Sequence, residues 1–321
     1  MISVMIPAYN AENTIRRCVE SVRSQSLQDF EIVIINDGST DRTGEILDAY
    51  AALDSRIHVF HQENRGISAS RNRAIQVCRG ALLTFVDADD VLLPGYLATL
   101  YKAMQDTGAA CVCCNHWIAQ GAHRYSCFSD AQPMRVFTPE QALENILYHG
   151  APDVSAWGKL YRRGLLEQIR YPEGALFEDA FVIADVVLAA GTVAFVPEPL
   201  YVYTLSDSSI SRTCAAGHEM DLPAAVNRMT DRIRECYPQM ERGCIRRRAH
   251  ALLSAMRVLD PAMHKSVWAD ARRQLLGYAL PVLFDTRAPA RDKLGILAAL
   301  PGHRFYRFVW GLYDKHRRRY G

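Results

Sequence analysis

The 321-residue sequence lacks several features that would place a protein in a special class at once. Its longest apolar stretch, around residues 274–284, is far shorter than the roughly 18 residues that a membrane-spanning helix needs. It has no internal repeat and no low-complexity segment, and hydrophobic residues make up 49% of it, as in ordinary globular proteins. We therefore expect one large globular α/β domain or two smaller ones, and no transmembrane helix.

The sequence has no cysteine pattern typical of a disulfide framework. The chain has nine cysteines, an odd number, and no secretory signal pattern opens the sequence. These observations favour a reducing cytoplasm over a disulfide framework. The cluster of Cys111, Cys113 and Cys114 lacks a second pair at the spacing of a zinc site, so we interpret its members as strand cysteines.

The sequence also lacks a large excess of positive or negative charge, because its formal net charge is only +2. The charges are nevertheless unevenly distributed. Residues 241–321 carry 17 Lys and Arg and 6 Asp and Glu, whereas the rest of the chain carries 20 and 29. This division indicates an acidic catalytic body and a basic end that meets an anionic partner.

The first hundred residues alternate strand and helix patterns. Apolar, mostly β-branched runs predict strands at residues 3–7, 31–36, 57–60 and 81–86. Helical spacing of apolar residues predicts helices at residues 15–22, 43–53 and 66–77. Repeated βαβ units predict a mostly parallel, Rossmann-like sheet with helices on both faces. Pro94 is expected at the first position of the next helix. From about residue 111 to 211 short strands and turns are expected, and from His218 onward helices.

Three predicted strands end in polar or acidic segments, at residues 7–10, 36–41 and 87–90. Parallel sheets bind ligands at the carboxyl ends of their strands. Crowded carboxylates there repel one another, and a divalent cation would relieve that cost. Asp87 and Asp89 offer the hard oxygen ligands that suit Mg²⁺ or Mn²⁺ bound to substrate phosphates. The alternative is a helix N-cap with favourable acids, which accounts for Asp90.

Two further side chains at this edge could contact a nucleotide. Asp37 leaves the second strand where its carboxylate could accept a hydrogen bond from a nucleobase or a ribose. For its neighbours Ser39 and Thr40, a tight turn with a helix N-cap is an equal alternative. Tyr9 could stack on a base, although its segment could also be a simple strand exit.

Four segments carry a resemblance to a known family. They are VMIPAYNAENTI from Val4, EIVIINDGSTDRT from Glu31, NRGISASRNRAI from Asn64 and ALLTFVDADDVLLPGYL from Ala81. In this order and spacing they resemble the nucleotide-binding half of family 2 glycosyltransferases of the GT-A fold. The match is close over residues 2–101 and continues more loosely, through WGKLYRR and FEDAFV, to about Arg212.

The resemblance implies a nucleotide-sugar donor, usually linked to UDP. It implies that Pro7, Tyr9 and Asp37 hold the uridine, that Asp87 lies near the ribose, and that Asp89 binds Mn²⁺ or Mg²⁺. A bound metal ion would neutralise the departing diphosphate.

The resemblance also implies inverting displacement with a carboxylate base, which its ED motif places at Asp179, after Glu178. A positioned base contributes about 10²–10⁴-fold to the rate. The alternative for Asp179 is an acid at a helix start or an ion-pair partner of Arg162 or Arg163.

Other site residues have weaker support. Trp157 resembles an aromatic residue at the floor of the acceptor site, and a core position is the alternative. Arg71 could contact phosphate or form an ion pair on a helix surface, and Arg212 could fold over the diphosphate. Lys159, Arg162 and Arg163 are expected to be solvated. The QxxRW stretch of processive family members is absent from the sequence, which favours transfer of a single sugar.

The C-terminal segment interleaves aromatic and basic residues from His303 to Arg319. On a helix, Phe305, Phe308, Val309 and Leu312 would share one face, flanked by aromatic residues and arginines. This pattern fits a helix that lies in an anionic membrane interface, where each base adds about 1 kcal/mol. The alternative is an amphipathic helix docked on the body. The aromatic stripe and the acidic body argue against a nucleic-acid partner.

We therefore interpret residues 1–212 as a GT-A catalytic domain, with a nucleotide-sugar-binding half at 1–106 and an acceptor half at 107–212. Residues 213–321 form a helical extension with a membrane-associating tail in this interpretation. The predicted activity is metal-dependent, inverting transfer of one hexosyl or glycuronosyl unit. The resemblance implies a lipid-linked oligosaccharide or lipopolysaccharide-type acceptor at the inner face of the cytoplasmic membrane.

Two alternatives remain at the level of the sequence. A nucleotidyltransferase shares the parallel sheet and the acidic edge, but a Gly-rich phosphate loop would be expected after its first strand, where this chain has Pro7-Ala8-Tyr9-Asn10. A catalytically retired binding protein of the same fold would be favoured by loss of Asp89 or Asp179, and both are present.

Overall fold

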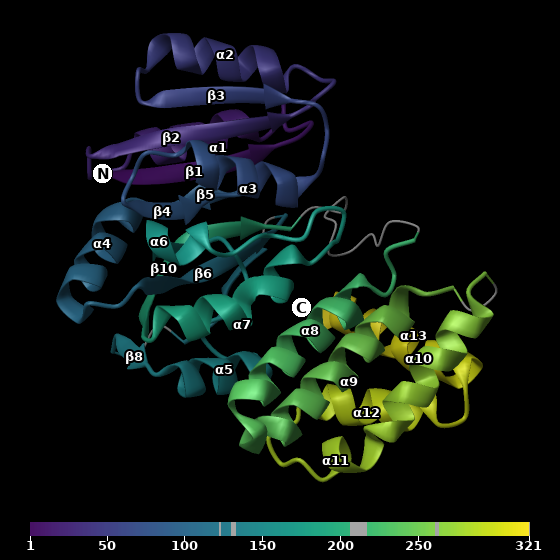
Figure 1. The fold of residues 1–321 in the computed structure, drawn as a ribbon. Helices are drawn as coiled ribbons and strands as arrows, with labels where there is room; N and C mark the ends of the chain where they lie inside the picture. Colours follow the sequence, from purple (N-terminus) through teal and green to yellow (C-terminus); the bar gives the residue numbers. More distant parts are fainter. Residues whose placement is uncertain (122, 130–132, 206–216, 261–262, 321) are drawn as a thin grey trace. The chain divides into compact units, whose positions relative to one another are not determined.

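The computed structural model describes residues 1–121, 123–129, 133–205, 217–260 and 263–320, the last seven of them as helical backbone only (Figure 1). The chain divides into two compact units, Met1–Ser209 and Ile210–Gly321. The first unit is built on a mixed sheet and the second on helices.

Four parallel strands form the first part of the sheet, in the order β3-β2-β1-β4. They are β1 (Ile2–Ala8), β2 (Phe30–Asp37), β3 (Ile57–Gln62) and β4 (Leu82–Phe85). Every residue of β1 and β2 is buried, because helices cover both faces of these strands. The predicted parallel sheet is confirmed.

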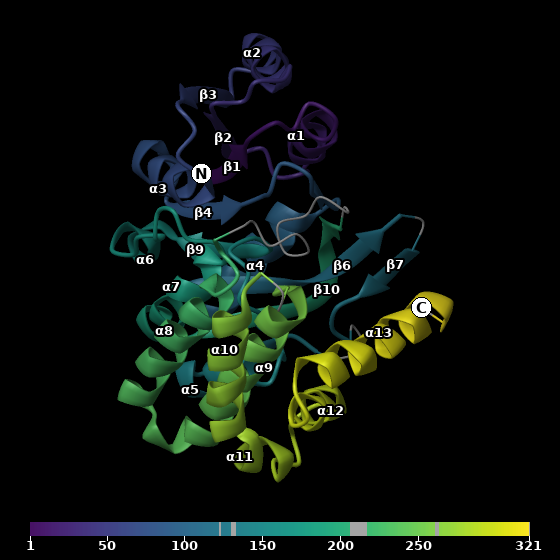
Figure 2. The ribbon, with the colours of Figure 1, turned by 90° about the vertical axis from the view of Figure 1, so that its right-hand side faces the viewer.

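Helices connect these strands and lie on both faces of the sheet. They are α1 (Ile15–Arg23), α2 (Thr43–Leu53), α3 (Ile67–Val77) and, after β4, α4 (Tyr96–Thr107). Figure 2 shows α1 and α3 on opposite sides of the parallel strands. Pro94 precedes the N-cap of α4 and is not its first residue, so that prediction is wrong. Gly95, at φ +86°, turns the chain first, a conformation open to glycine and closed to proline.

The sheet continues through strands of mixed direction, in the order β4-β9-β6-β10-β5. These are β5 (Val91–Leu92), β6 (Cys111–Gln120), β9 (Lys159–Arg162) and β10 (Val193–Thr204), with β7 (His123–Ser126) on β6 and β8 (Arg135–Phe137) on β10. The expectation of short strands holds for β7, β8 and β9, with 4, 3 and 4 residues, but is wrong for β6 and β10, with 10 and 12. Prolines within β10 interrupt its strand pattern in the sequence, and in the sheet its register with β6 shifts on either side of Pro199.

The cysteine cluster lies on β6, as predicted. Cys111, Cys113 and Cys114 are buried, and burial raises the pKa of Cys111 and Cys114 to about 12. These thiols therefore stay protonated and unreactive at neutral pH. Helices α5 (Pro139–Leu147), α6 (Arg163–Glu167) and α7 (Glu178–Ala190) complete the first unit.

The second unit contains α8 (Asp221–Cys236), a 3₁₀ turn (Pro238–Met240), α9 (Glu241–Val258), α10 (Lys265–Gly277), α11 (Ala279–Leu283), α12 (Ala290–Ala299) and α13 (His303–Tyr320). Its core includes Trp268, Tyr306 and Trp310. The sequence predicted that aromatic residues flank an exposed face of α13. For Trp310 this prediction is wrong, because its ring packs inward. Among the described residues, no helix has both the length and the apolar character to span a bilayer.

Candidate active site

The loops that follow β1 and β2 are bonded to each other. Asn10, at φ +46°, donates its backbone N–H to Ser39 Oγ at 3.0 Å and accepts from the Thr40 N–H at 2.8 Å. These bonds fix the backbone next to Tyr9, which is 51% exposed. Pro7 lies inside β1, one residue before its end. The candidate aromatic side chain is thus held on a rigid strand end and remains accessible.

Asp37, at the end of β2, is buried and holds the start of α3. Its Oδ1 accepts from Gln62 Nε2 at 2.6 Å and from the Arg65 N–H at 3.0 Å, and its Oδ2 accepts from the Gly66 N–H at 2.8 Å. A carboxylate has about four acceptor positions, so these three bonds nearly fill it. In this structure Asp37 therefore organises the loop between β3 and α3.

Asp90 connects the acidic segment after β4 to β10. Its Oδ2 accepts from the Tyr201 hydroxyl at 2.6 Å, and its Oδ1 accepts from the Thr204 N–H at 2.7 Å. Burial, then the charges of Asp89 and Asp87, raise the pKa of Asp90 well above its usual range. The N-cap interpretation of Asp90 is wrong, because α4 begins only at Tyr96.

Asp89, like Asp87, is partly exposed, whereas Asp90 is buried. Burial and the neighbouring charge of Asp87 raise the pKa of Asp89 to about 6. Arg17 Nη2 donates to the Asp89 backbone oxygen at 2.7 Å and to Thr204 Oγ1 at 3.2 Å, which fixes the main chain. No Lys or Arg in the described part of the chain forms an ion pair with the Asp89 carboxylate.

The donor set around Asp89 fits a cation that is shared with a substrate. The described residues contain no cluster of three or more His, Cys, Asp or Glu side chains able to enclose a metal ion. Mg²⁺ and Mn²⁺ sites that use one or two carboxylates and substrate phosphates need no such cluster. Asp89, whose carboxylate forms no ion pair with a described Lys or Arg side chain, is the residue that would hold the ion.

Arg71, on α3, joins the acidic segment to α7. Its Nη2 donates to Asp87 Oδ1 at 3.0 Å, and its Nη1 donates to Glu178 Oε1. The guanidinium is buried and lies 5.5 Å from the ring centre of Phe85 and 5.6 Å from that of Tyr171. Burial opposes its charge, but Glu178 and Asp87 outweigh this and raise its pKa. The prediction of an ion pair on a helix surface is wrong, because both pairs are internal.

Asp179 lies at the start of α7, next to Glu178. Phe177, the residue before the helix, has φ +60°, which is strained for a bulky side chain and typical of functional sites. Asp179 is partly exposed. Burial, then the Glu178 carboxylate, raise its pKa to about 7. A carboxylate with a pKa near neutrality suits proton transfer at physiological pH.

The ion-pair alternative for Asp179 is wrong within the described structure. Arg163 pairs with Glu167 at 2.8 Å and donates to the Cys78 carbonyl at 2.7 Å, and Arg162 forms no ion pair with Asp179. Asp179 remains an acid at a helix start that faces no arginine of β9.

Trp157 is partly buried beside the end of β4. Its backbone pairs with Phe85 of that strand. Its ring stacks on Tyr201 and Tyr203, with centres 4.6 and 5.0 Å apart, and meets His116 edge-on at 4.9 Å. Trp157 therefore packs against the core and also borders the segment of Asp87 and Asp89.

Lys159 is buried, so the expectation of a solvated side chain is wrong. Its Nζ donates to Asp153 Oδ1 at 2.7 Å, to the Ser155 carbonyl at 2.6 Å and to Ser155 Oγ at 2.9 Å. Burial opposes ionisation of Asp153, but Lys159 and then His116 lower its pKa to about 2. This ion pair closes the loop that presents Trp157. The sequence did offer a signal for this burial, because the lysine stands between Gly158 and the apolar residues of β9.

Lys159→Met is expected to lower the free energy of unfolding by about 3–5 kcal/mol, because it leaves Asp153 partly buried without its cation. Urea denaturation measures the effect. The double variant Asp153→Asn/Lys159→Met should recover much of the loss, since no isolated charge remains. Lys102→Met is the control: its pair with Asp106 is exposed and should contribute less than about 1 kcal/mol. A Lys159 effect no larger than the control would refute the role of the buried pair.

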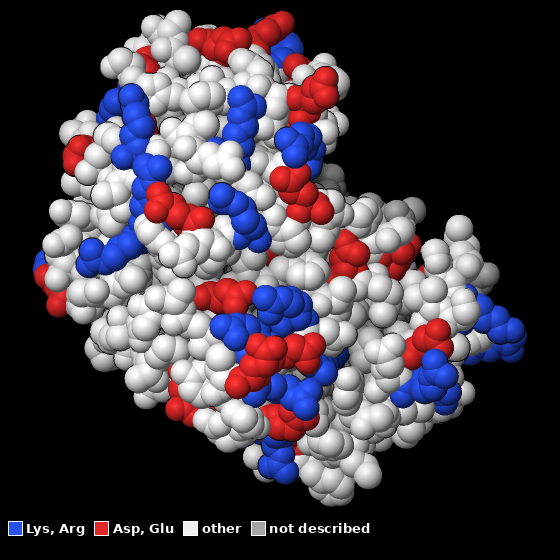
Figure 3. Space-filling model, viewed as in Figure 1, with Lys and Arg blue, Asp and Glu red and all other residues white. Residues whose placement is uncertain are grey.

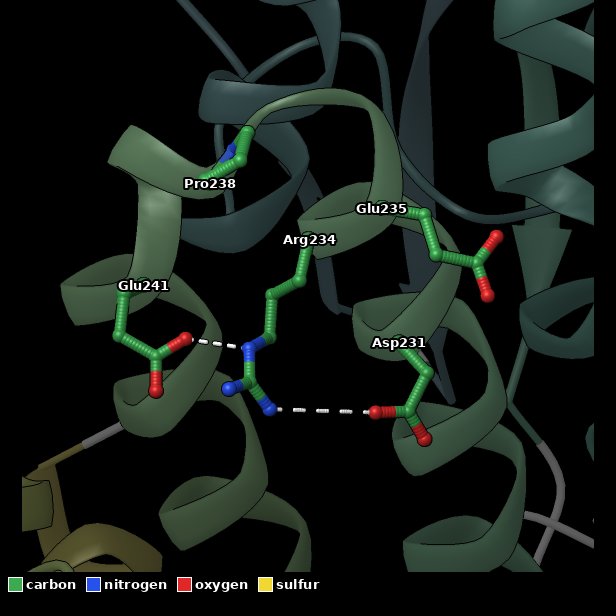
Figure 4. Close-up of a pocket in the computed structure, with 5 residues that line it drawn as sticks. All are labelled: Asp231, Arg234, Glu235, Pro238 and Glu241. Atoms are coloured by element: carbon green, nitrogen blue, oxygen red, sulfur yellow. Dashed lines mark ion pairs between the residues drawn. The ribbon is translucent and has the colours of Figure 1, made fainter.

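A surface pocket lies in the second unit, between α8 and α9 (Figure 4). It is lined by Asp231, Arg234, Glu235, Pro238 and Glu241. Arg234 forms ion pairs with Glu241 and, at 4.0 Å, with Asp231. The third acid of the pocket, Glu235, pairs with Arg232 at 3.0 Å. All three acids of the pocket are therefore held in surface ion pairs, and none of them is a candidate catalytic group. Arg212 lies outside the described residues.

The sequence model of glycosyl transferase family 2 matches residues 3–170, and the chain belongs to this family. The curated glycosyltransferase GlyA of Streptococcus pneumoniae is 35% identical over 239 residues, which cover 72% of this chain and 34% of GlyA. The chain therefore matches about a third of that relative's length. The predicted family resemblance is confirmed.

Two solved structures show the same fold. S. aureus TarS 1–349 in complex with UDP-GlcNAc has a TM-score of 0.68 and 19% sequence identity, covering 98% of this chain and 92% of that chain. The mannosyltransferase PcManGT of Pyrobaculum calidifontis, in complex with GDP-Man and Mn²⁺, has a TM-score of 0.53 and 16% identity, covering 98% and 87%. These similarities confirm the predicted GT-A fold.

Proposed function

We propose that this family 2 member transfers one hexosyl or glycuronosyl unit from a nucleotide-sugar, by a metal-dependent, inverting reaction. The buried bridge of Arg71 carries the proposal. Its bonds to Asp87 and Glu178 bring the acidic end of β4 close to the start of α7. This bridge supports placing the proposed metal ligand, Asp89, and the proposed base, Asp179, in one site, although 90 residues separate them.

The donor in this proposal is a UDP-sugar. TarS, which shares the fold, was solved with UDP-GlcNAc. In our proposal Tyr9 and Pro7 contact the uracil, Asp37 orders the adjoining loop and Asp87 contacts the ribose. Arg71 acts on the donor through Asp87, because its guanidinium already bonds to two carboxylates. Arg212 contacts the diphosphate.

The cofactor in this proposal is Mn²⁺ or Mg²⁺, held by Asp89. PcManGT, which shares the fold, was solved with GDP-Man and Mn²⁺. When bound, the ion supplies positive charge that stabilises the departing nucleoside diphosphate. The partly exposed carboxylate of Asp89 and its raised pKa support this assignment, because burial and the Asp87 charge both oppose a negative charge that forms no ion pair among the described residues.

The proposed chemistry is a single displacement at the anomeric carbon. The acceptor oxygen bonds to that carbon as the bond to the diphosphate oxygen breaks on the opposite side. Asp179 accepts the proton of the acceptor hydroxyl. Glu178 bonds to Arg71 and so keeps the neighbouring Asp179 in place. Trp157 forms part of the acceptor floor. Residues 107–212 would supply the acceptor half and residues 1–106 the donor half.

The acceptor in this proposal is a lipid-linked oligosaccharide or a lipopolysaccharide-type glycolipid. The enzyme would then work at the inner face of the cytoplasmic membrane, with residues 213–321 as the membrane-associating region. The basic charge of that region supports the assignment. Exposed apolar residues at its C-terminal end add further support.

A panel of UDP-sugars tests the proposed function. Each is incubated with the purified chain in Mn²⁺, Mg²⁺ or a chelator, and thermal stability and hydrolysis are measured. We expect stabilisation by at least one UDP-sugar that disappears with the chelator, reaching about 2.7 kcal/mol at one hundred times the dissociation constant. Release of pyrophosphate from a nucleoside triphosphate and a sugar phosphate would favour the nucleotidyltransferase instead. No binding of any UDP-sugar in either metal would reject the proposal.

A further inference from the structure

Exposed leucine and phenylalanine side chains gather on the last helices of the second unit. Eight of the exposed large hydrophobic residues in the described part of the chain lie within residues 280–312. The largest exposed fractions among them are 75% at Phe284, 68% at Leu280 and 61% at Phe308. Single exposed apolar residues are ordinary, but such a concentration marks an interaction site. We refer to the exposed Leu and Phe residues within 280–312 as the apolar surface.

Helix geometry directs these side chains outward. On α13, Phe305, Phe308 and Leu312 follow helical spacing and are exposed, whereas Tyr306 and Trp310 are buried. The rings of Phe305 and Phe308 lie 6.4 Å apart. Helix α12 packs against both α11 and α13, and Figure 2 shows it between them. The apolar surface is thus distributed over neighbouring helices and extends beyond the C-terminal helix.

Within the segment that carries the apolar surface, the exposed Asp, Glu and Arg side chains are all arginines. From Ala279 to Tyr313 the only acids are Asp285 and Asp292, and each is 2% exposed. Arg287, Arg291, Arg304 and Arg307 are exposed in the same segment. Figure 3 shows acidic and basic side chains mixed over α8 and α9, whereas the surface around α11 is largely uncharged.

Two of these arginines have an acid nearby: Asp260, an exposed acid outside the segment, lies 3.6 Å from Arg307, and the buried Asp292 lies 3.7 Å from Arg291. Beyond Tyr313 the sequence has one acid, Asp314, and four basic residues, Lys315, Arg317, Arg318 and Arg319. The segment as a whole therefore remains cationic.

We propose that the apolar surface and its arginines dock on an anionic lipid bilayer. Leucine and phenylalanine side chains enter the boundary between headgroups and acyl chains while the arginines meet the anionic headgroups. A second copy of the chain fits less well, because an isologous contact would bring the same arginines face to face. Docking brings the chain to a membrane that holds a lipid-linked acceptor, and in this the proposal rests on the acceptor class of the proposed function.

Vesicle sedimentation tests the surface directly. The full chain is mixed with vesicles of phosphatidylcholine alone or of equal parts phosphatidylcholine and phosphatidylglycerol. We expect binding to the anionic vesicles, weakened by salt, and little binding to the neutral ones. Phe305→Ser/Phe308→Ser should weaken the binding about tenfold or more, and so should Arg304→Glu/Arg307→Glu. Leu53→Ser is the matched control, because Leu53 is 78% exposed on α2 of the other unit.

The outcomes separate the possible occupants and the two proposals. Unchanged binding by the phenylalanine variant, or equal binding to neutral vesicles, would overturn the membrane assignment. So would a concentration-dependent dimer, measured by light scattering, that the same variant abolishes. Thermal melting verifies that each variant is folded. Vesicle binding needs no sugar transfer, and UDP-sugar hydrolysis needs no vesicle, so failure of one leaves the other standing.

Discussion

Asp179→Asn is expected to reduce sugar transfer by about 10²–10⁴-fold, because an amide cannot accept the proton of the acceptor hydroxyl. The substitution preserves the shape of the side chain and can keep the 2.7 Å bond from the Ala180 N–H to Oδ1. Donor affinity should therefore remain close to that of the unsubstituted chain. Transfer is measured as product formed in a single turnover, and donor affinity by calorimetry with UDP and Mn²⁺.

The pH dependence of transfer gives an independent readout of the same residue. Burial and the Glu178 charge raise the pKa of Asp179 to about 7. The base acts in its deprotonated form, so the rate should rise with pH up to about 7 and level off above it. Below that value it should fall about tenfold for each pH unit. In Asp179→Asn this limb of the profile should be lost.

Glu167→Gln is the matched control for Asp179→Asn. Glu167 is an exposed carboxylate on α6 that pairs with Arg163, and its neutralisation should leave transfer within about twofold. Transfer by Asp179→Asn at a rate close to that of this control would remove Asp179 from the role of base. Loss of UDP affinity together with transfer would instead indicate a disrupted donor site.

Asp89→Ala is expected to abolish the effect of Mn²⁺ on UDP binding. Without its carboxylate the ion loses its protein ligand, and UDP should bind about 10–100-fold more weakly in Mn²⁺, reaching the affinity measured in chelator. Titration calorimetry of UDP with and without Mn²⁺ measures both values. The fold should be retained, because Asp90, and not Asp89, bonds to β10.

Asp106→Ala is the control for the removal of a carboxylate. Asp106 lies on α4 and its exposed side chain pairs with Lys102. This variant should keep the full Mn²⁺ dependence of UDP binding. If Asp89→Ala also keeps it, Asp89 is not the metal ligand and the proposed cofactor site is wrong.

The parallel part of the sheet could be predicted from the sequence. Strands covered on both faces are nearly continuous apolar runs, and β2 shows this in full. The face of α1 that buries Ile15, Cys18, Val19 and Val22 follows the helical spacing of those residues. Chain order and parallel direction then place the polar strand ends along one edge. The positions of Asp37, Asp87 and Asp89 at strand ends follow from these local patterns.

Buried charged residues could not be predicted in the same way. Arg71 pairs with Glu178, 107 residues away, and Asp90 bonds to Tyr201, 111 residues away. Whether a charged side chain is solvated or internal depends on partners that only the folded chain brings together. Trp310 shows the same limit for an apolar residue, since helical spacing defines a face but not which neighbour covers it.

The strained backbone at Phe177 was also beyond the sequence. A phenylalanine gives no local signal for a left-handed conformation, which only the surrounding structure can impose. Its position directly before Glu178 and Asp179 adds a structural argument for that helix start as a functional site.

The central claim is that the acidic end of β4 binds a nucleoside diphosphate through a divalent cation. Crystals of the chain grown with UDP and Mn²⁺ test this most directly, because manganese is located by its anomalous scattering. The account predicts a manganese peak between the Asp89 carboxylate and the diphosphate oxygens, with the uracil beside Tyr9. Diphosphate bound elsewhere, or a manganese ion remote from Asp89, would contradict it.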